Sequence, residues 1–164
     1  MQNEVSVLAA FFHMVIFMNN EKRIISFPAG KTYEHILHTS VHAHPIKRGF
    51  PKEPTSYVMF RKSGGEMEYL FRVKKTVDFY IQDLLSGTVS LSGIDNAELE
   101  QIKTYVLERK DLFGFKYLTE YPYRFYILEK AGILSPSLVR TPNIQGYCFY
   151  KQEDVIYHIQ KGTM

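Results

Sequence analysis

The chain has 164 residues, of which 45% are hydrophobic and 23% charged, a composition typical of one globular domain spanning residues 1–164. Its single cysteine, Cys148, excludes an internal disulfide and a cysteine-based structural zinc site, and favours a reducing, cytoplasmic location. The formal net charge of +3 permits an anionic partner without requiring one.

The first apolar segment runs from Val5 to Met18. It lacks the basic residues that begin a signal peptide, because Glu4 precedes it, and it is shorter than the roughly 20 residues that span a bilayer. We therefore expect no membrane segment here. Hydrophobic periodicity leaves two alternatives open, a buried strand and a short buried helix.

A strand, a helix and a loop are predicted between residues 23 and 55. Arg23–Phe27 is a short β-branched run ended by Pro28, which predicts a strand. Lys31–His38 carries apolar residues at helical spacing, with Thr32 as a possible cap, and predicts a short helix. Three prolines and Gly49 in His44–Thr55 predict a loop.

A β-hairpin is the most strongly indicated element. Tyr57–Phe60 and Met67–Ile81 are rich in β-forming residues, and Gly64-Gly65 between them supplies the positive φ of a tight turn. Apolar residues occupy most odd positions of the second strand, so the odd face is predicted to be buried.

The rest of the chain predicts a helix, three strands and a last helix. Asp95 with Glu98 three residues later forms a capping box, which places a helix N-terminus there. The further predictions are strands at Phe113–Tyr117, Tyr123–Leu128 and Gln145–Tyr150, a loop at Ala131–Ile144, and a helix at Glu153–Gln160. This order, without βαβ alternation, favours an α+β fold with a curved, mostly antiparallel sheet.

Four histidines lie close together in the sequence, at His35, His38, His42 and His44. Spacings of three and four would place imidazoles on one helix face, as in metal sites. Pro45 and the β-branched residues near position 40 oppose a helix that long. We therefore predict neither a metal nor a cofactor.

Basic residues are concentrated between Lys47 and Lys75, where eight Lys or Arg residues stand against three Glu residues. Arg72 and Lys74 occupy the outward face of the long strand, the face that a sheet presents to a ligand. The alternative interpretation is an ordinary solvated sheet face beside a basic loop.

The order of elements and one short motif resemble the PUA-like superfamily, nearest the ASCH domains. Gly30, Lys31 and Glu34 match a Gly-x-Lys-x-x-Glu-x-Arg signature, although one residue is missing after the glycine and Ile36 stands at the arginine. The resemblance implies a small β-barrel with flanking helices, whose cleft binds RNA, DNA or a modified base. It also implies a possible amidohydrolase site at Lys31, Thr32 and Glu34.

These observations lead to three hypotheses. The first is a non-enzymatic module that binds a nucleic acid or a modified nucleotide and stacks a base on an aromatic ring. Its phosphate-binding residues would be Lys31, Arg61, Lys62, Arg72 and Lys74. The second is an enzyme acting on a modified nucleoside, and the third is a protein-interaction module with an exposed apolar patch.

Overall fold

The computed structural model describes residues 23–140 and 144–159, and the expected element at Val5–Met18 lies outside these ranges. Within them the chain forms six strands and four helices. In chain order these are β1 (Arg23–Pro28), α2 (Tyr33–Thr39), β2 (Val41–Pro45), β3 (Tyr57–Arg61), β4 (Glu66–Phe79), α3 (Ile81–Leu85), α4 (Asn96–Leu112), β5 (Tyr123–Val139), β6 (Cys148–Lys151) and α5 (Gln152–Ile159).

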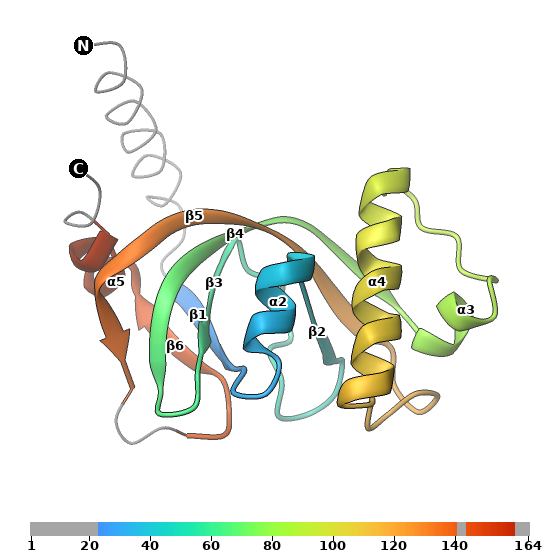
Figure 1. Cartoon of the computed structure of the whole chain (residues 1–164), viewed down its shortest axis with the longest axis horizontal. Coiled ribbons are helices and arrows are strands. Elements are labelled where there is room, and N and C mark those ends of the chain that lie inside the picture. The colour runs from blue at the N-terminus through green and yellow to red at the C-terminus, as the bar shows by residue number, and fades with distance from the viewer. Residues whose placement is uncertain (1–22, 141–143, 160–164) are drawn as a thin grey trace, which may run out of the picture.

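The six strands form one mixed, mostly antiparallel sheet in the order β2-β5-β4-β3-β1-β6. Only the β1–β3 pair is parallel among the described strands. The expected α+β class with a mostly antiparallel sheet is therefore confirmed. The expectation of a closed barrel is wrong, because β2 and β6 remain as the two edges among the described strands. The long strands β4 and β5 bend along the molecule and connect its two ends (Figure 1).

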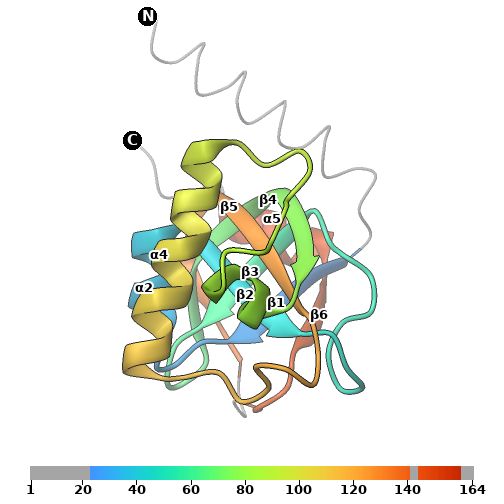
Figure 2. The same ribbon diagram turned by 90° about the vertical axis from the view of Figure 1, so that its right-hand side faces the viewer.

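Helices cover both faces of the sheet. On one face α2 and α4 pack side by side, as Figure 2 shows, and α4 contacts β2 and β5. The core beneath them includes Phe27, Phe60 and Phe125. A smaller core on the other face joins Met59 of β3 to Val155 of α5.

The predicted hairpin is confirmed. Gly64 and Gly65 have φ values of 92° and 91°, the left-handed conformation that glycine adopts without steric cost. Phe71 is 2% exposed, as the strand pattern predicts. Leu70 is also buried, against that pattern, because a register irregularity follows it and the core under α5 covers its face.

Two strands reach into segments expected to be loops, β2 with its last two residues, His44 and Pro45, and β5 with residues 131–139. Val41–Pro45 is an edge strand, since Ser40, with φ of 55°, ends α2 and sends the chain into the sheet. β5 continues to Val139 through the predicted loop at 131–144. Met67 of β4 pairs with Leu138 of β5, but Tyr69 pairs with Ile133, so the register shifts in the part of β5 that contains Pro136. Pro136 is tolerated there because this irregular stretch needs no regular ladder hydrogen bond.

The helical predictions mostly hold. Asp95 accepts a hydrogen bond from the Glu98 N–H at 2.9 Å, and the Glu98 carboxylate accepts one from the Asp95 N–H, so the capping box is present.

The predicted strand at 113–117 is wrong, because that segment is an irregular loop after α4. No helix in the described ranges is both long and apolar enough to cross a bilayer.

Candidate functional site

A pocket of about 380 Å³ opens where β1 ends, beside the edge strand β2 and the C-terminal end of α4. The turn into α2, the last turn of α4 and the loop that follows it all lie along the lower edge of the molecule in Figure 1. A cavity of this volume is within the usual range for small-molecule sites.

The turn at residues 28–32 is fixed against the hairpin. The Ala29 N–H donates to the Arg61 carbonyl at 2.9 Å, and the Thr32 N–H donates to the Ala29 carbonyl. A side chain at Gly30 would meet Ser63 Oγ at 2.9 Å, so only glycine allows this approach without a shift. The turn therefore holds Lys31 and Thr32 in the pocket wall.

Aromatic rings form the base of the pocket. Phe27 lies 4.6 Å from the His42 ring and 5.4 Å from the His44 ring, measured between centroids. His44 also stacks on Phe50 with an interplanar angle of 4°. Tyr123 completes this surface. Flat rings in such an arrangement suit a planar ligand group.

Both histidines of the pocket are neutral at pH 7. Burial lowers the pKa of His44 to about 4, and the Nδ1–H to Pro45 carbonyl bond offsets only part of that effect. His44 Nε2 lies 3.2 Å from the Tyr126 hydroxyl, which can donate to it. Burial also lowers the pKa of His42 well below its ordinary value, with His44 and Arg109 acting in the same direction.

Arg109 brings a positive charge to the pocket from the last turn of α4. Its Nη1 donates to the Tyr105 hydroxyl at 2.6 Å and to the Ala43 carbonyl at 3.2 Å. Its guanidinium carbon lies 4.5 Å from the centroid of the Phe115 ring. Its Nε is buried without a partner, and no carboxylate of the described chain pairs with it. The guanidinium is thus held in place, and no carboxylate within residues 23–140 and 144–159 compensates its charge.

The loop after α4 adds a tyrosine between two lysines. Lys47 Nζ lies 3.9 Å from the centroid of the Tyr117 ring, and Lys116 Nζ lies 5.4 Å from it. Hydrogen bonds from Lys47 and then Lys116 lower the pKa of the Tyr117 hydroxyl. The Tyr117 N–H donates to the Tyr123 hydroxyl at 3.3 Å, which ties the loop to β5.

The charges of the pocket therefore have one sign. Lys31, Arg109 and Lys116 line it, and no Asp or Glu among the described residues does so. Lys31 makes no hydrogen bond or ion pair with any described residue. Because nearby cations without counter-charges raise the local concentration of anions, the pocket is electrostatically suited to an anionic ligand.

The structure brings only Lys31, of the five predicted phosphate-binding residues, into this pocket. Arg61 is 0% exposed, and its guanidinium donates to the carbonyls of Ile144 and Gly146. It therefore anchors the segment that leads into β6. Lys62 is paired with Glu68, with 2.5 Å between Nζ and Oε1.

Arg72 and Lys74 lie on the outward face of β4, as the strand pattern predicts. Arg72 is paired there with Glu129 of β5, at 2.5 Å between Nη2 and Oε2. Lys74 is exposed. The pKa of Asp95 is lowered mainly by its hydrogen bond from the Glu98 N–H, and the charge of Lys74 adds a smaller effect in the same direction. Neither residue lines the pocket.

The alternative set of Lys31, Thr32 and Glu34 is divided. Lys31 and Thr32 line the pocket, whereas Glu34 is exposed on α2 and does not. The four clustered histidines are divided as well. His35 Nδ1 lies 3.0 Å from Glu108 Oε2, while His42 and His44 face the pocket rings. Within the described ranges, no three metal-binding side chains are grouped to hold an ion.

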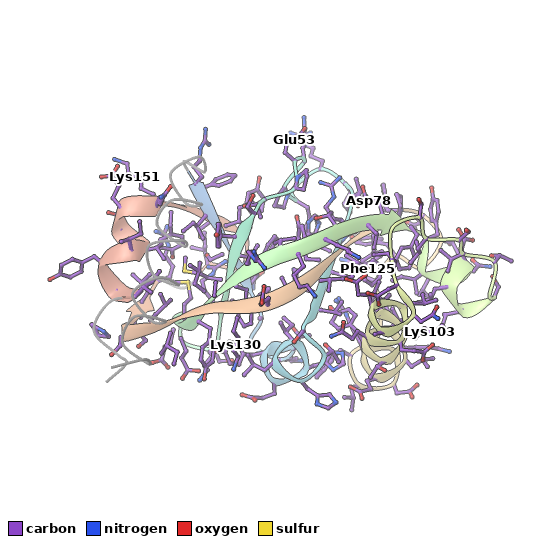
Figure 3. All side chains as sticks on the ribbon, turned by 90° about the horizontal axis from the view of Figure 1, so that it is seen from above. Glu53, Asp78, Lys103, Phe125, Lys130 and Lys151 are labelled. Carbon is purple, nitrogen blue, oxygen red and sulfur yellow. The ribbon has the colours of Figure 1, made fainter. Side chains whose placement is uncertain are left out.

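Sequence reasoning missed Arg109, Lys116 and Tyr117 as site residues. Arg109 lies near the C-terminal end of a helix, where a positive charge interacts favourably with the helix dipole. From the sequence alone, this interaction is enough to explain an arginine there, so nothing indicates a binding role. The aromatic segment after α4 predicts a strand, and only the tertiary structure places it beside β2. Figure 3 shows α4 beside the sheet, with Phe125 between them and Lys103 on the outer side of the helix.

No protein-family model, no curated protein and no solved structure matches this chain.

Proposed function

We propose that the chain binds a nucleotide unit, free or within a nucleic acid, in the pocket between the turn at residues 28–32, β2 and the C-terminal end of α4. The observation that carries this proposal is Arg109, a fixed guanidinium with no carboxylate partner in the described chain, beside a set of aromatic rings. A nucleotide combines the two chemistries that this pocket offers, because it has an anionic phosphate and a planar base.

The cations suit the phosphate. Arg109 keeps Nη2 for a phosphate oxygen, because Nη1 already donates to the Tyr105 hydroxyl and the Ala43 carbonyl and Nε is buried. Lys31 adds a mobile ammonium group on another wall of the pocket. The absence of carboxylates from the described lining means that a phosphate meets no like charge there.

The rings suit the base. Phe50 is the partly exposed ring of the pocket and stacks on His44, while Phe27 and Tyr123 line the same pocket but are only 3% and 1% exposed. Phe50 is therefore the ring on which a base would stack. Stacking of a base on an aromatic ring contributes about 1–3 kcal/mol. His42 and His44 are neutral, so these two histidines bring no additional charge to a neutral base.

A second candidate function is hydrolysis of an acylated nucleoside. It is favoured by one observation, that Lys31 and Thr32 lie together in the pocket wall. Glu34 lies outside that wall, so the set implied by the family resemblance is incomplete in this structure. Release of acetate from N4-acetylcytidine by the wild type, abolished in Lys31→Gln, would favour this candidate over simple binding.

The test of binding is calorimetric titration with a nucleoside 5′-monophosphate and with the corresponding nucleoside. We expect the monophosphate to bind more tightly. Arg109→Gln should weaken its binding about tenfold to a hundredfold, since hydrogen bonds to charged groups contribute about 1.5–3 kcal/mol. Lys31→Gln should weaken it as well without changing stability, because Lys31 is exposed and makes no hydrogen bond or ion pair in the described structure.

Lys103→Gln is the matched control. Lys103 lies on α4 like Arg109, but its side chain is 43% exposed and pairs with Glu100 at 2.7 Å. The substitution removes one positive charge from the same helix, so affinity should be unchanged. Equal affinity of the monophosphate and the nucleoside, or an Arg109→Gln variant that binds as the wild type does, would argue against the pocket.

A stable protein complex insensitive to salt would instead favour the interaction-module hypothesis.

A further inference from the structure

A second groove, of about 720 Å³, lies beside the pocket and shares one wall residue with it, Phe50. Ile25 lines the groove and Phe27 lines the pocket. These residues are two apart in β1, so their side chains lie on the same face of the sheet. The two cavities therefore follow one another along β1.

The groove is also basic. Arg23, Arg48 and Lys52 line it, against a single carboxylate, Glu53, among its described lining. All four residues are exposed. No ion pair occupies Arg48 or Lys52 within the described ranges. In Figure 3, β4 and β5 lie between Glu53 and the two helices α2 and α4, so this end of the groove is distant from these helices.

An exposed aromatic ring stands in this groove. Phe149 of β6 is 50% exposed and is paired with Ile25 of β1 across the antiparallel ladder. The Arg23 guanidinium lies 5.2 Å from the centroid of the Phe149 ring, and Tyr147 packs against that ring at 90°. A half-exposed ring between basic side chains has the features of a platform for base stacking.

We infer that the ligand is a single-stranded nucleic acid, with one nucleotide in the pocket and the adjoining nucleotides in the groove. This inference rests on the proposed function of the pocket. It follows from the shared wall at Phe50, the excess of positive charge and the half-exposed ring of Phe149. A duplex fits less well, because its bases are stacked on one another and offer no free face to Phe149.

The test compares two probes on the full chain. One is a nucleoside 5′-monophosphate, and the other is a fluorescein-labelled single strand of about eight nucleotides, within the site size of small single-strand binders. The wild type should bind the longer strand more tightly than the monophosphate. It should also bind the strand more tightly than a duplex of the same sequence, and equal affinity for strand and duplex would overturn the inference.

Phe149→Ala should weaken binding of the single strand about fivefold to a hundredfold, the range expected for the loss of one stacked base. It should leave binding of the monophosphate unchanged. Unchanged affinity of Phe149→Ala for the strand would overturn the inference. Arg109→Gln, in contrast, should weaken binding of both probes. If Arg109→Gln changes neither probe while Phe149→Ala weakens the strand, the proposed function of the pocket fails and the groove alone binds.

A second variant is needed in case Phe149→Ala does not fold. Arg48→Gln with Lys52→Gln changes only exposed loop side chains. It should reduce the slope of log affinity against log salt by about 0.7 for each phosphate that the loop no longer binds. An unchanged slope would show that the loop does not meet the phosphates and would contradict the inference.

Discussion

The Arg109 guanidinium donates to the Tyr105 hydroxyl at 2.6 Å, and the same hydroxyl accepts a bond of 3.2 Å from the Ala43 N–H of β2. Tyr105 is 0% exposed. One buried hydroxyl thus connects the last turns of α4 to the edge strand and holds the charged group of the pocket.

Tyr105→Phe should therefore affect both stability and binding. The Ala43 N–H and one Arg109 N–H would lose their acceptor, at a cost of about 1–3 kcal/mol in the free energy of unfolding. Affinity for a nucleoside monophosphate should fall as well, because Arg109 would be held less firmly. Urea denaturation and calorimetry measure the two effects. Tyr80→Phe, at a 40% exposed position, is the control, and equal behaviour of the two variants would contradict this role of Tyr105.

Phe71→Ala tests the orientation of the central strand. Phe71 is 2% exposed and lies at 5.4 Å from Phe60 between ring centroids. Truncating a buried phenylalanine typically costs about 3–5 kcal/mol. Val139→Ala, at a 57% exposed position of β5, should cost no more than about 0.5 kcal/mol. A loss below about 1 kcal/mol for Phe71→Ala in urea denaturation would mean that this packing contributes little.

Asp95→Ala tests the N-terminus of α4. The Asp95 side chain accepts from the Glu98 N–H, and Glu98 is joined to Lys75 of β4 at 2.5 Å. Loss of an N-cap side chain costs about 0.5–2 kcal/mol. Glu100→Ala, which removes only an exposed pair with Lys103, should change stability much less. Equal thermal midpoints for the two variants would contradict the importance of the cap.

Acidification should destabilise the fold through His44. The unfolded chain protonates a histidine near pH 6.5, whereas burial lowers the pKa of folded His44 to about 4. The unfolded state therefore binds more protons between these values, and stability is full above pH 6.5 and falls as the pH decreases towards 4. From about pH 7.5 to about pH 5, His44 alone should remove about 2 kcal/mol.

Urea denaturation at these two pH values measures the effect in the wild type and in His44→Phe. The variant keeps a ring against Phe27 and Phe50 but cannot be protonated. Its loss of stability over this pH interval should be smaller by about 2 kcal/mol. The same loss in both proteins would show that His44 does not control the acid response.

The hairpin and the capped helix could be predicted because their signals are local. Gly64-Gly65 requires a positive φ within two residues, and Asp95 with Glu98 forms its bonds within one turn. The strand at 41–45 could not be predicted in the same way. It is short and lies at the edge of the sheet, and its partner β5 begins far along the chain, at Tyr123.

The pocket could be predicted only in part, because its walls come from distant segments. Lys31 could be identified from a local motif, and the structure places it in the pocket wall. Arg109 belongs to the site only because the Tyr105 hydroxyl and the Ala43 carbonyl hold it against β2. Conversely, no local pattern indicates that Arg61 is enclosed, since its carbonyl partner Ile144 is 83 residues away.

The salt dependence of binding tests the central claim most directly, by comparing two pairs of cations. Lys31→Gln with Arg109→Gln removes charge from the pocket, and Arg72→Gln with Lys74→Gln removes it from the outward face of β4. With a labelled single strand, we predict that the pocket pair lowers the log–log slope by about 0.7, the value for the single phosphate that these two cations hold. The β4 pair should have little effect, since Arg72 and Lys74 line neither the pocket nor the groove. A slope reduced by the β4 pair and unchanged by the pocket pair would contradict the claim.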